Sequence, residues 1–465
     1  MPTEGKESAS DRRMFLKATG ASVAALGLAG CASNGGNQNT GGGGGGGGGE
    51  STSGGGGGGG SKEPITIGHI GPVQTDVGKG SERSAKLAVD EINGDGGIMD
   101  RQVKLVTGDT QLSPSQTNTV VAGMIDNGVD MIVGGFASET VLGIEDRLAH
   151  ADVPFLGTGA ASPEVTQDHV GKNYDRYKNI FRVGPQNSDF QADKLADYGA
   201  YLADKYGWNT QSVVSEDAEW TKPVTARTAT RMKEKYGLDV PINKRIAPDT
   251  SDFSPVLDDV EQSGARVMMK AIAHIPGTSM LATWGENEYP FAQEGTNVAS
   301  MSPAYWKDTN GNCRYESEAE SAAGGFGTIT DKTIPFRKRF QKQYSSRPTT
   351  PMYMGCDTYD AIYIYKNAVE SAGTSDYANN LDDIVAALEK TDYTGVTGRV
   401  QFFGKDEKYP HDVIPGVDKV PYTPVQWQKA EDGNGLAGTE GTKECVWPEK
   451  HATADHVPAP WVPTN

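Results

Sequence analysis

Basic residues are scarce in this chain: 43 Lys and Arg stand against 61 Asp and Glu, which gives a formal net charge of −18. Nucleic-acid phosphates are bound mainly by Lys and Arg, so this composition argues against a nucleic-acid partner. The carboxylate excess predicts a solvated acidic surface, a bias that does not by itself define a function.

Cysteine is scarce as well, with four in the chain. Apart from Cys31, these are Cys313, Cys356 and Cys445, an odd number that allows at most one disulfide among them. A Cys313–Cys445 bridge is chemically allowed outside the cell. No pair has the spacing of a metal site, so we expect no metal and no cofactor.

Motifs of common enzyme classes are also missing, including the Gly-x-Ser-x-Gly elbow and the His-Glu-x-x-His pair. The many carboxylates single out no acid/base pair, because most carboxylates on an acidic surface only interact with solvent. Beyond residue 30, no apolar run approaches the roughly 20 residues that a membrane-spanning helix needs. We therefore expect no catalytic residues and no enzymatic activity.

The first thirty residues have the order of a secretory signal. Arg12 and Arg13 follow a polar start, and an uncharged, weakly apolar run extends from 18 to 30. That run is shorter than the roughly 20 residues of a spanning helix, so we expect residues 1–30 to be removed. The arginine pair, with Phe-Leu-Lys close behind it, resembles the twin-arginine signals that export folded proteins.

Cys31 ends this segment in the sequence Leu-Ala-Gly-Cys, which resembles the lipobox of bacterial and archaeal lipoproteins. Cleavage before Cys31 would free its thiol for a lipid and would hold the chain on the outer face of the cytoplasmic membrane. The alternative is that Cys31 is an ordinary small residue of the signal. Together with the acidic composition, the signal resembles secreted proteins of salt-loving archaea.

Residues 31–63 contain two long glycine tracts, at 41–49 and 54–60. Such a segment cannot bury apolar surface and behaves as a flexible coil with a reach on the order of 30 Å. The tracts lack the Lys-Ser/Thr of a phosphate-binding loop. We expect a linker here, followed by roughly 400 residues that suffice for two domains.

From residue 64 onward, β-rich runs alternate with helical periods. Strands are predicted at 65–69, 103–108, 130–134 and 153–156, and Ala85, Ala88, Val89 and Ile92 mark one face of the helix that follows the first strand. Ser113-Pro114 predicts a capped helix start, and Ser138 a further cap. This alternation indicates a parallel sheet with helices on both faces.

A second series with the same alternation begins near residue 187. It predicts strands at 211–215, 240–246 and 265–272 and helices at 189–206, 222–236, 252–263 and 277–287. The predicted fold class is therefore α/β, with two doubly wound lobes. Ligands of such sheets bind beyond the carboxyl ends of the strands, so we expect a cleft between the lobes.

Several segments in order resemble one known family, the solute-binding proteins of ABC importers of the branched-chain amino acid (Leu/Ile/Val) type. They are Ile-Thr-Ile-Gly-His-Ile-Gly-Pro at 65–72, Ala-Val-Asp-Glu-Ile-Asn-Gly-Asp-Gly-Gly at 88–97, Gly-Val-Asp-Met-Ile-Val-Gly at 128–134, and the segments 249–253, 359–361 and 395–398. Each motif is short, but the ordered set spans nearly all of 64–405.

The resemblance implies the type I periplasmic-binding fold, in which the chain crosses between the lobes three times. We expect the crossings near 184, 300 and 396, which gives 64–184 and 301–395 to the first lobe and 185–300 and 396–465 to the second. It also implies hinge closure around a small ligand, docking of a monomer onto an ABC permease with its ATPase subunits, and membrane contact through the lipid alone.

In the first lobe, the resemblance places one wall of the site at Thr75, Asp76 and Val77. Ser138, between Ala137 and Glu139, matches a family serine that holds the ligand carboxylate together with backbone N–H groups. Ser138 is equally a good helix N-cap.

The next loop contributes Gly159, Ala160 and Ala161, and Ala161 stands where the family has a threonine that helps to bind the α-amino group. The hydroxyl is therefore missing.

In the second lobe, Trp220 stands where the family has a tyrosine, just after Glu216 and Asp217. Trp220 either encloses the ligand or packs in the core, and His274, next to Ile275, either bonds a ligand or fills a loop. Gly277 replaces an acid that pairs with the ligand ammonium, and a buried ammonium without an anionic partner is disfavoured. Glu139, Asp217 or Glu216 could compensate. For Tyr353 and Met354 we expect core packing.

The sequence thus predicts a receptor for a small polar organic solute, either an amino acid or an amide or urea-type compound. The alternative is a ligand-sensing module of the same fold that does not take part in transport.

Overall fold

The computed structural model describes residues 63–464, which belong to one compact unit that begins at residue 60. The predictions for Arg12, Arg13, Cys31 and the glycine tracts lie outside the described residues and stay predictions. Within residues 63–464, no helix is both long and apolar enough to cross a bilayer.

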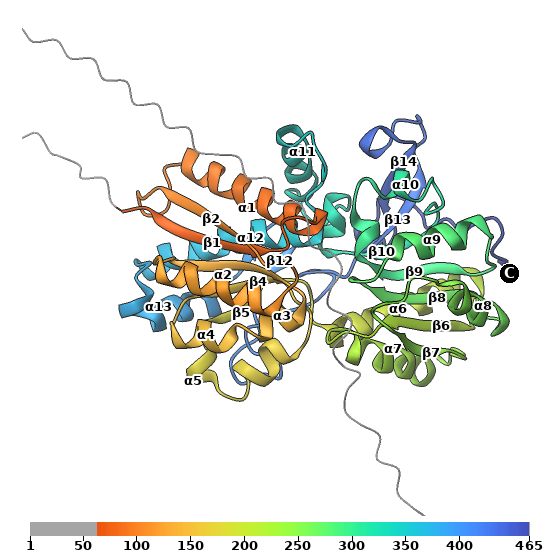
Figure 1. The fold of residues 1–465 in the computed structure, drawn as a ribbon, viewed down its shortest axis with the longest axis horizontal. Helices are drawn as coiled ribbons and strands as arrows, with labels where there is room; N and C mark the ends of the chain where they lie inside the picture. Colours follow the sequence, from red (N-terminus) through yellow and green to blue (C-terminus); the bar gives the residue numbers. More distant parts are fainter. Residues whose placement is uncertain (1–62, 465) are drawn as a thin grey trace, which may run out of the picture. The chain divides into compact units, whose positions relative to one another are not determined.

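The first lobe is built on a parallel sheet with the strand order β2-β1-β3-β4-β5 (Figure 1). This order, in which the second strand lies at the edge, is that of a doubly wound sheet, so the predicted fold class is confirmed. The strands are β1 (Ile65–Gly71), β2 (Val103–Asp109), β3 (Met131–Phe136), β4 (Phe155–Gly159) and β5 (Ile180–Arg182).

Both faces of this sheet are buried, and β3 shows why its sequence is continuously apolar. Met131 and Val133 pack on one side with Ala85 and Ala88, whereas Ile132 packs on the other side with the following helices. Figure 1 shows α1 beside α12 over the sheet. The helices of this lobe are α1 (Asp76–Gly94), α2 (Pro114–Asp126), α3 (Ser138–Leu142), α4 (Glu145–His150), α5 (Tyr174–Tyr177), α11 (Thr333–Gln343), α12 (Met352–Ala372) and α13 (Tyr377–Glu389).

The two predicted serine caps have different outcomes. The Ser113 side chain accepts a hydrogen bond from Gln116 N at 3.3 Å, and Pro114 opens α2 as predicted. The cap prediction for Ser138 is wrong, because Ala137 takes the cap position of α3 and Ser138 is the first helical residue. The Ser138 hydroxyl is thereby left for other contacts.

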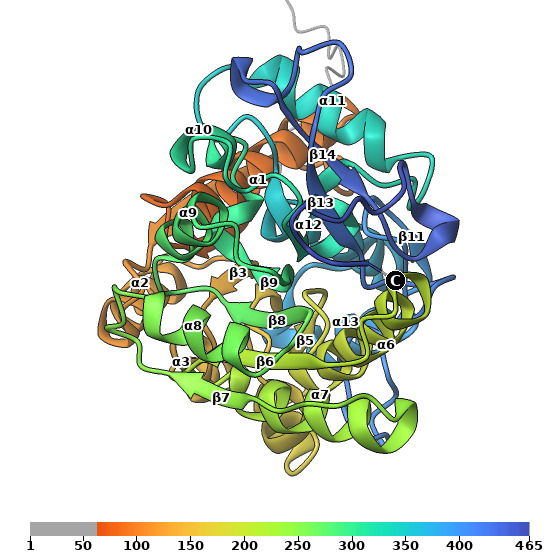
Figure 2. The same ribbon diagram turned by 90° about the vertical axis from the view of Figure 1, so that its right-hand side faces the viewer.

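The second lobe has a parallel sheet with the order β7-β6-β8-β9, seen from its own side in Figure 2. The predicted strand at 240–246 begins late, since Pro241 has no N–H to donate to the sheet. The elements are α6 (Ser188–Tyr206), β6 (Gln211–Glu216), α7 (Thr221–Tyr236), β7 (Asn243–Ile246), α8 (Ser254–Gln262), β8 (Val267–Ile272), α9 (Gly277–Glu286), β9 (Ala292–Asn297) and α10 (Tyr305–Asp308).

An antiparallel sheet that the sequence did not predict extends the second lobe. It consists of β10 (Ser317–Ala319), β13 (Pro424–Lys429) and β14 (Gly441–Cys445), and β10 also packs beside β9. A small hairpin of β11 (Tyr393–Thr394) and β12 (Arg399–Val400) lies apart from it. The chain then returns to the second lobe, where Trp208 Nε1 donates to Pro463 O at 2.8 Å.

The points at which the chain passes from one lobe to the other can be located from the hydrophobic core in which its buried residues pack. Ala319 and Tyr422 pack in the core of the second lobe, whereas Ala322 and Val420 pack in the core of the first. This packing favours a second and a third crossing near 320 and 421, later than the expected 300 and 396. The exact lobe boundaries stay a proposal.

Cys313, Cys356 and Cys445 are buried free thiols in this structure, so the Cys313–Cys445 bridge that the sequence allowed is not formed.

Candidate functional site

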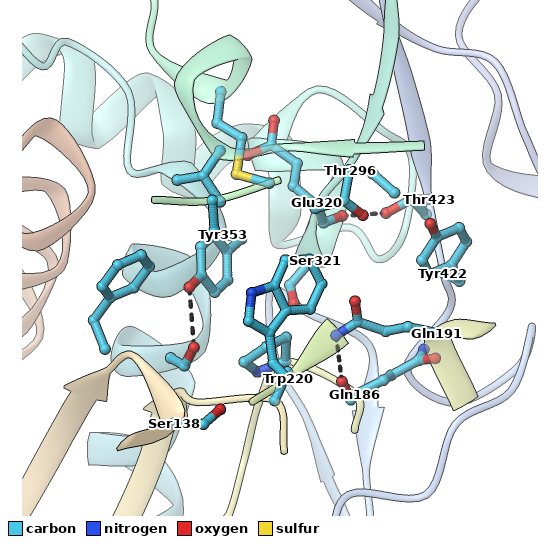
Figure 3. A pocket seen from close by; sticks show the side chains of 18 of the residues that line it. Ser138, Gln186, Gln191, Trp220, Thr296, Glu320, Ser321, Tyr353, Tyr422 and Thr423 are labelled. Atoms are coloured by element: carbon cyan, nitrogen blue, oxygen red, sulfur yellow. Dashed lines mark hydrogen bonds between the residues drawn. The ribbon is translucent and has the colours of Figure 1, made fainter. Parts of the chain in front are cut away.

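A cavity lies where the carboxyl ends of the two parallel sheets face each other (Figure 3). Ala137 and Ser138 follow β3, Ala161 follows β4, and Ala273 and His274 follow β8. This is the position at which doubly wound sheets bind ligands. The cavity has a volume of about 70 Å³, room for roughly five water molecules or a small organic compound.

The cavity walls are largely apolar and aromatic. Trp220 and Tyr353 lie on either side of it in Figure 3, and Phe136, Val298 and Met301 complete this surface. The Tyr353 hydroxyl donates to Gly159 O at 3.1 Å, which fixes the ring at the wall. Tyr353 therefore lines the site in addition to packing with Met354, the core role expected for both residues.

Ser138 supplies a hydrogen-bond donor to the cavity. Its Oγ accepts from Ser162 N at 3.0 Å, and it is 1% exposed. Because that contact uses the oxygen as an acceptor, the hydroxyl hydrogen is left to donate to a ligand. The neighbouring Ala137 has φ = 67°, an uncommon backbone conformation of the kind found at binding sites.

Glu216, at the end of β6, organises the opposite wall through four donors. Oε1 accepts from Trp220 Nε1 at 2.8 Å and from His274 Nδ1 at 2.6 Å, and Oε2 accepts from the Ala273 and His274 amides at 2.9 and 2.8 Å. These contacts place Trp220 and His274 at the cavity.

The two charged groups of this wall favour each other's ionised form. Burial raises the pKa of Glu216, but the hydrogen bonds and charge of His274 outweigh burial and hold the pKa below its ordinary value. Burial lowers the pKa of His274, and the Glu216 carboxylate outweighs burial and raises it. Each group therefore stabilises the charged form of the other across the contact of 2.6 Å between His274 Nδ1 and Glu216 Oε1.

Two of the predicted site residues join the lobes and do not line the cavity. Glu139 Oε1 accepts from the Glu219 amide at 3.0 Å across the cleft. Asp76 Oδ2 accepts from Ser302 Oγ at 2.5 Å and pairs with Arg347 Nε at 2.6 Å. The rings of Phe136 and His274, one from each lobe, also meet, with their centroids 5.4 Å apart.

Other predicted residues lie in neighbouring structure, outside the lining of the cavity. Thr75 caps α1 by accepting from Gly78 N at 3.3 Å, and Val77 packs beside Tyr353. Ala160 and Ile275 belong to the cores of the first and second lobes, and Asp217 pairs with Arg245 at 2.6 Å. Of the predicted residues, the structure brings together Ala137, Ser138, Gly159, Ala161, Trp220 and His274.

Sequence reasoning missed the contribution of the crossing segments. Gln186, Gln191, Ser321, Tyr422 and Thr423 line the cavity, and the Gln191 amide lies beside Gln186 in Figure 3. Gln191 Nε2 donates to Gln186 O at 2.6 Å, so its Oε1 remains an acceptor. The sequence signal that could have pointed to these residues was Pro185-Gln186, which directly follows the first predicted crossing.

The resemblance predicts contacts to a ligand ammonium at positions 161 and 277, and in this chain neither position carries a side chain that could make one. A Cβ at Gly277 would lie 2.4 Å from Asn297 Oδ1, so an acidic side chain does not fit there. The Ala161 carbonyl already accepts from Ser188 N at 2.8 Å and Ser188 Oγ at 2.9 Å.

Residues 64–416 match the sequence profile of the family described as "Periplasmic binding protein". The chain belongs to this family. A relative is the Leu/Ile/Val-binding protein homolog 2 of Brucella abortus, 23% identical over 77% of this chain and 88% of its own length. An ABC transporter substrate-binding protein from Sphaerobacter thermophilus has the same fold, with a TM-score of 0.65 and 20% identity over 85% of this chain and 98% of its own.

A second solved structure of this fold is an ABC transporter solute-binding protein from R. palustris in complex with benzoate. Its TM-score is 0.64, with 12% identity over 86% of this chain and 99% of its own. The chain is thus a solute-binding receptor with the type I periplasmic-binding fold, from a family of extracytoplasmic binding proteins.

Proposed function

We propose that this receptor serves an ABC importer and captures a small polar organic solute by closing its two lobes. The observation that carries the proposal is the cavity between the carboxyl ends of both sheets, whose lining includes the free hydroxyl hydrogen of Ser138. The contacts of Glu139 and Asp76 across the cleft fit a closed arrangement.

The candidate ligands are branched-chain or other amino acids and amide or urea-type compounds. Relatives are named for Leu, Ile and Val, and a protein of the same fold holds benzoate. Leu, Ile, Val and benzoate share a carboxylate on an apolar body, and such a ligand suits a serine donor that faces aromatic walls.

The proposed partners are the permease, which would contact the receptor directly, and its ATPase subunits. The receptor would act as a monomer, exported through Arg12 and Arg13 and held on the outer face of the membrane by a lipid on Cys31. Mass spectrometry of the mature N-terminus tests the anchor, and an unmodified or uncleaved Cys31 would refute it.

A binding screen tests the receptor function. Amino acids, amides and carboxylates are added to the purified protein in high salt, and a compound that fills the cavity should raise Tm by mass action. Ser138→Ala should then weaken that compound by about tenfold or more, since a hydrogen bond to a charged group is lost. If no compound raises Tm, the proposal fails.

Ser113→Ala is the matched control. Removing the cap of α2 should cost about 1 kcal/mol of stability without changing affinity, because Ser113 is outside the lining of the cavity.

If uptake of the identified compound persists after deletion of the gene, the protein is a sensing module and not a transport receptor.

A further inference from the structure

We infer that Glu320 is the counter-ion of an ammonium group on the ligand, and that it binds this group at the side of the cavity away from Ser138. The inference rests on the proposed function, because it assigns a further binding residue to the same cavity and narrows the class of solute. Positions 161 and 277, where the resemblance predicts contacts to an ammonium, carry no side chain for that role. The anionic contact therefore comes from another part of the chain.

The first step concerns the charges in the lining of the cavity. Among the described residues that line it, Glu320 is the only carboxylate, and there is no lysine or arginine. The imidazole in this lining, that of His274, is already bonded to Glu216. Glu320 directly follows β10, in the segment where the chain passes between the lobes, and it is 4% exposed. A buried carboxylate in such a lining favours a ligand of opposite charge.

The second step is that Glu320 has an oxygen left for a ligand. Its Oε1 pairs with Lys443 Nζ, whereas its Oε2 is buried and has no hydrogen-bond partner in the described part of the chain. A buried acceptor without a partner costs free energy, because it has lost its contact with water. A ligand N–H group that donates to this oxygen would remove that cost.

The third step is that Lys443 does not balance the charge of this cluster. Its Nζ also lies 2.9 Å from Glu318 Oε1, so one ammonium faces two carboxylates in the interior. Burial and the neighbouring Glu320 carboxylate raise the pKa of Glu318 well above its ordinary value, as expected where positive charge is lacking. A ligand ammonium would supply the missing positive charge, and buried charges are stable only when they are paired.

The fourth step concerns the position of the ammonium on the ligand. Figure 3 shows Ser138, the proposed donor to the ligand carboxylate, and Glu320 at opposite sides of the cavity. The rings of Tyr353 and Trp220 lie between them and suit methylene groups. An ammonium next to the carboxylate would lie on the side of Ser138, where Ala161 offers no acid. The class of ligand is therefore an amino acid whose ammonium is separated from its carboxylate by a methylene chain.

Isothermal titration calorimetry on the purified protein tests the inference with ligands on common skeletons. One series is butanoate, 2-aminobutanoate and 4-aminobutanoate, and the other is pentanoate, 2-aminopentanoate and 5-aminopentanoate. In each series that binds, we expect the terminal amino compound to bind at least about tenfold more tightly than the other two, because it alone places an ammonium at Glu320.

An unsubstituted carboxylate or a 2-amino compound that binds as tightly as the terminal amino compound overturns the inference. If neither series binds while the broader screen finds another ligand, the inference is wrong and the receptor function stands. If no compound in that screen raises Tm, the proposed function fails as well.

Glu320→Gln gives a second measurement, since it removes the charge and nearly preserves the shape of the side chain. The affinity for the terminal amino compound should fall at least about tenfold, whereas the affinity for the unsubstituted carboxylate should change less than about threefold. Lys443 keeps Glu318 as its partner in this variant. Equal changes for the two ligands would overturn the role of Glu320.

Glu431→Gln is the matched control, because it removes the same charge from an exposed position after β13. It should change neither affinity. The ligand series uses the unaltered protein, so it decides the inference even if Glu320→Gln does not fold.

Discussion

His69 lies in β1 and belongs to a chain of buried polar side chains in the first lobe. Its Nε2 bonds to Ser81 Oγ, which bonds to Thr358 Oγ1, which bonds to Thr158 Oγ1, each at 2.8 Å. Burial, assisted by the charge of Lys79, lowers the pKa of His69 to about 3. The folded protein therefore keeps this ring neutral at any moderate pH.

The neutral ring makes the protein sensitive to mild acid. Below a pH of about 6.5 His69 binds a proton in the unfolded chain but not in the folded chain. The free energy of unfolding therefore decreases as the pH is lowered. Between pH 7 and pH 5 this costs about 2 kcal/mol. His69→Gln should abolish that part of the pH dependence of unfolding by urea, whatever its effect at pH 7. If His69→Gln and the exposed control His150→Gln show the same pH dependence, His69 is not responsible.

Single residues show what the sequence could and could not predict about the site. Ser138, Trp220 and His274 were assigned to the site by the resemblance to the family, which matched them to loops that follow predicted strands. Gln191 and Tyr422 were missed because their position at the cavity depends on how the crossing segments fold back. The pairing of His274 with Glu216 requires two loops to meet in space, and a single sequence has no signal for that.

At the scale of elements, Arg347 joins the start of α1 to α10. It pairs with Asp76 at 2.6 Å and with Asp308 at 3.1 Å, while its own side chain is 54% exposed. Asp76 opens α1 of the first lobe, and Asp308 ends α10, whose Tyr305 packs in the core of the second lobe, so the arginine joins elements that pack in different cores. Exposed ion pairs of this type contribute about 0.2–1 kcal/mol each.

Arg347→Gln should therefore weaken ligand binding by about two- to fivefold at low salt, because the closed arrangement loses a modest contact. The loss should disappear near 1 M salt, where charges on the surface are screened beyond about 3 Å. Calorimetric titrations at both salt concentrations check this. Arg399→Gln is the matched control, since Arg399 pairs with Asp392 within one hairpin. If Arg347→Gln weakens ligand binding equally at low and high salt, the explanation is refuted.

The elements of the two parallel sheets were predictable, whereas the antiparallel sheet was not. Helices such as α1 and α6 have apolar residues at a regular spacing, and buried parallel strands are short apolar runs. β10 and β13 lie far apart in the sequence, and β10 is short. β10 also carries Glu318, which is buried beside Lys443, whereas a sequence pattern would place a charged residue on the surface. This pairing depends on tertiary contacts that no local pattern encodes.

For the whole molecule, the net charge of −18 predicts that salt stabilises the fold. Like charges repel more strongly in the compact state than in the expanded one, and added ions screen this repulsion. Tm should rise by on the order of 5 °C between about 0.01 M and 1 M potassium chloride, most of it at the lower concentrations. Calorimetric melting checks the rise, with sucrose as an uncharged control. A Tm that is unchanged or falls with salt contradicts the argument.

The return of the chain after β14 places the two ends of the described part on different lobes. β1 begins at Ile65 in the first lobe, whereas Trp208 binds Pro463 in the second. Any change in the angle between the lobes therefore changes the distance between these ends. Two fluorophores, one before β1 and one at the carboxyl terminus, would convert occupancy of the cavity into a change in resonance energy transfer, and the protein would serve as an optical reporter of its own solute.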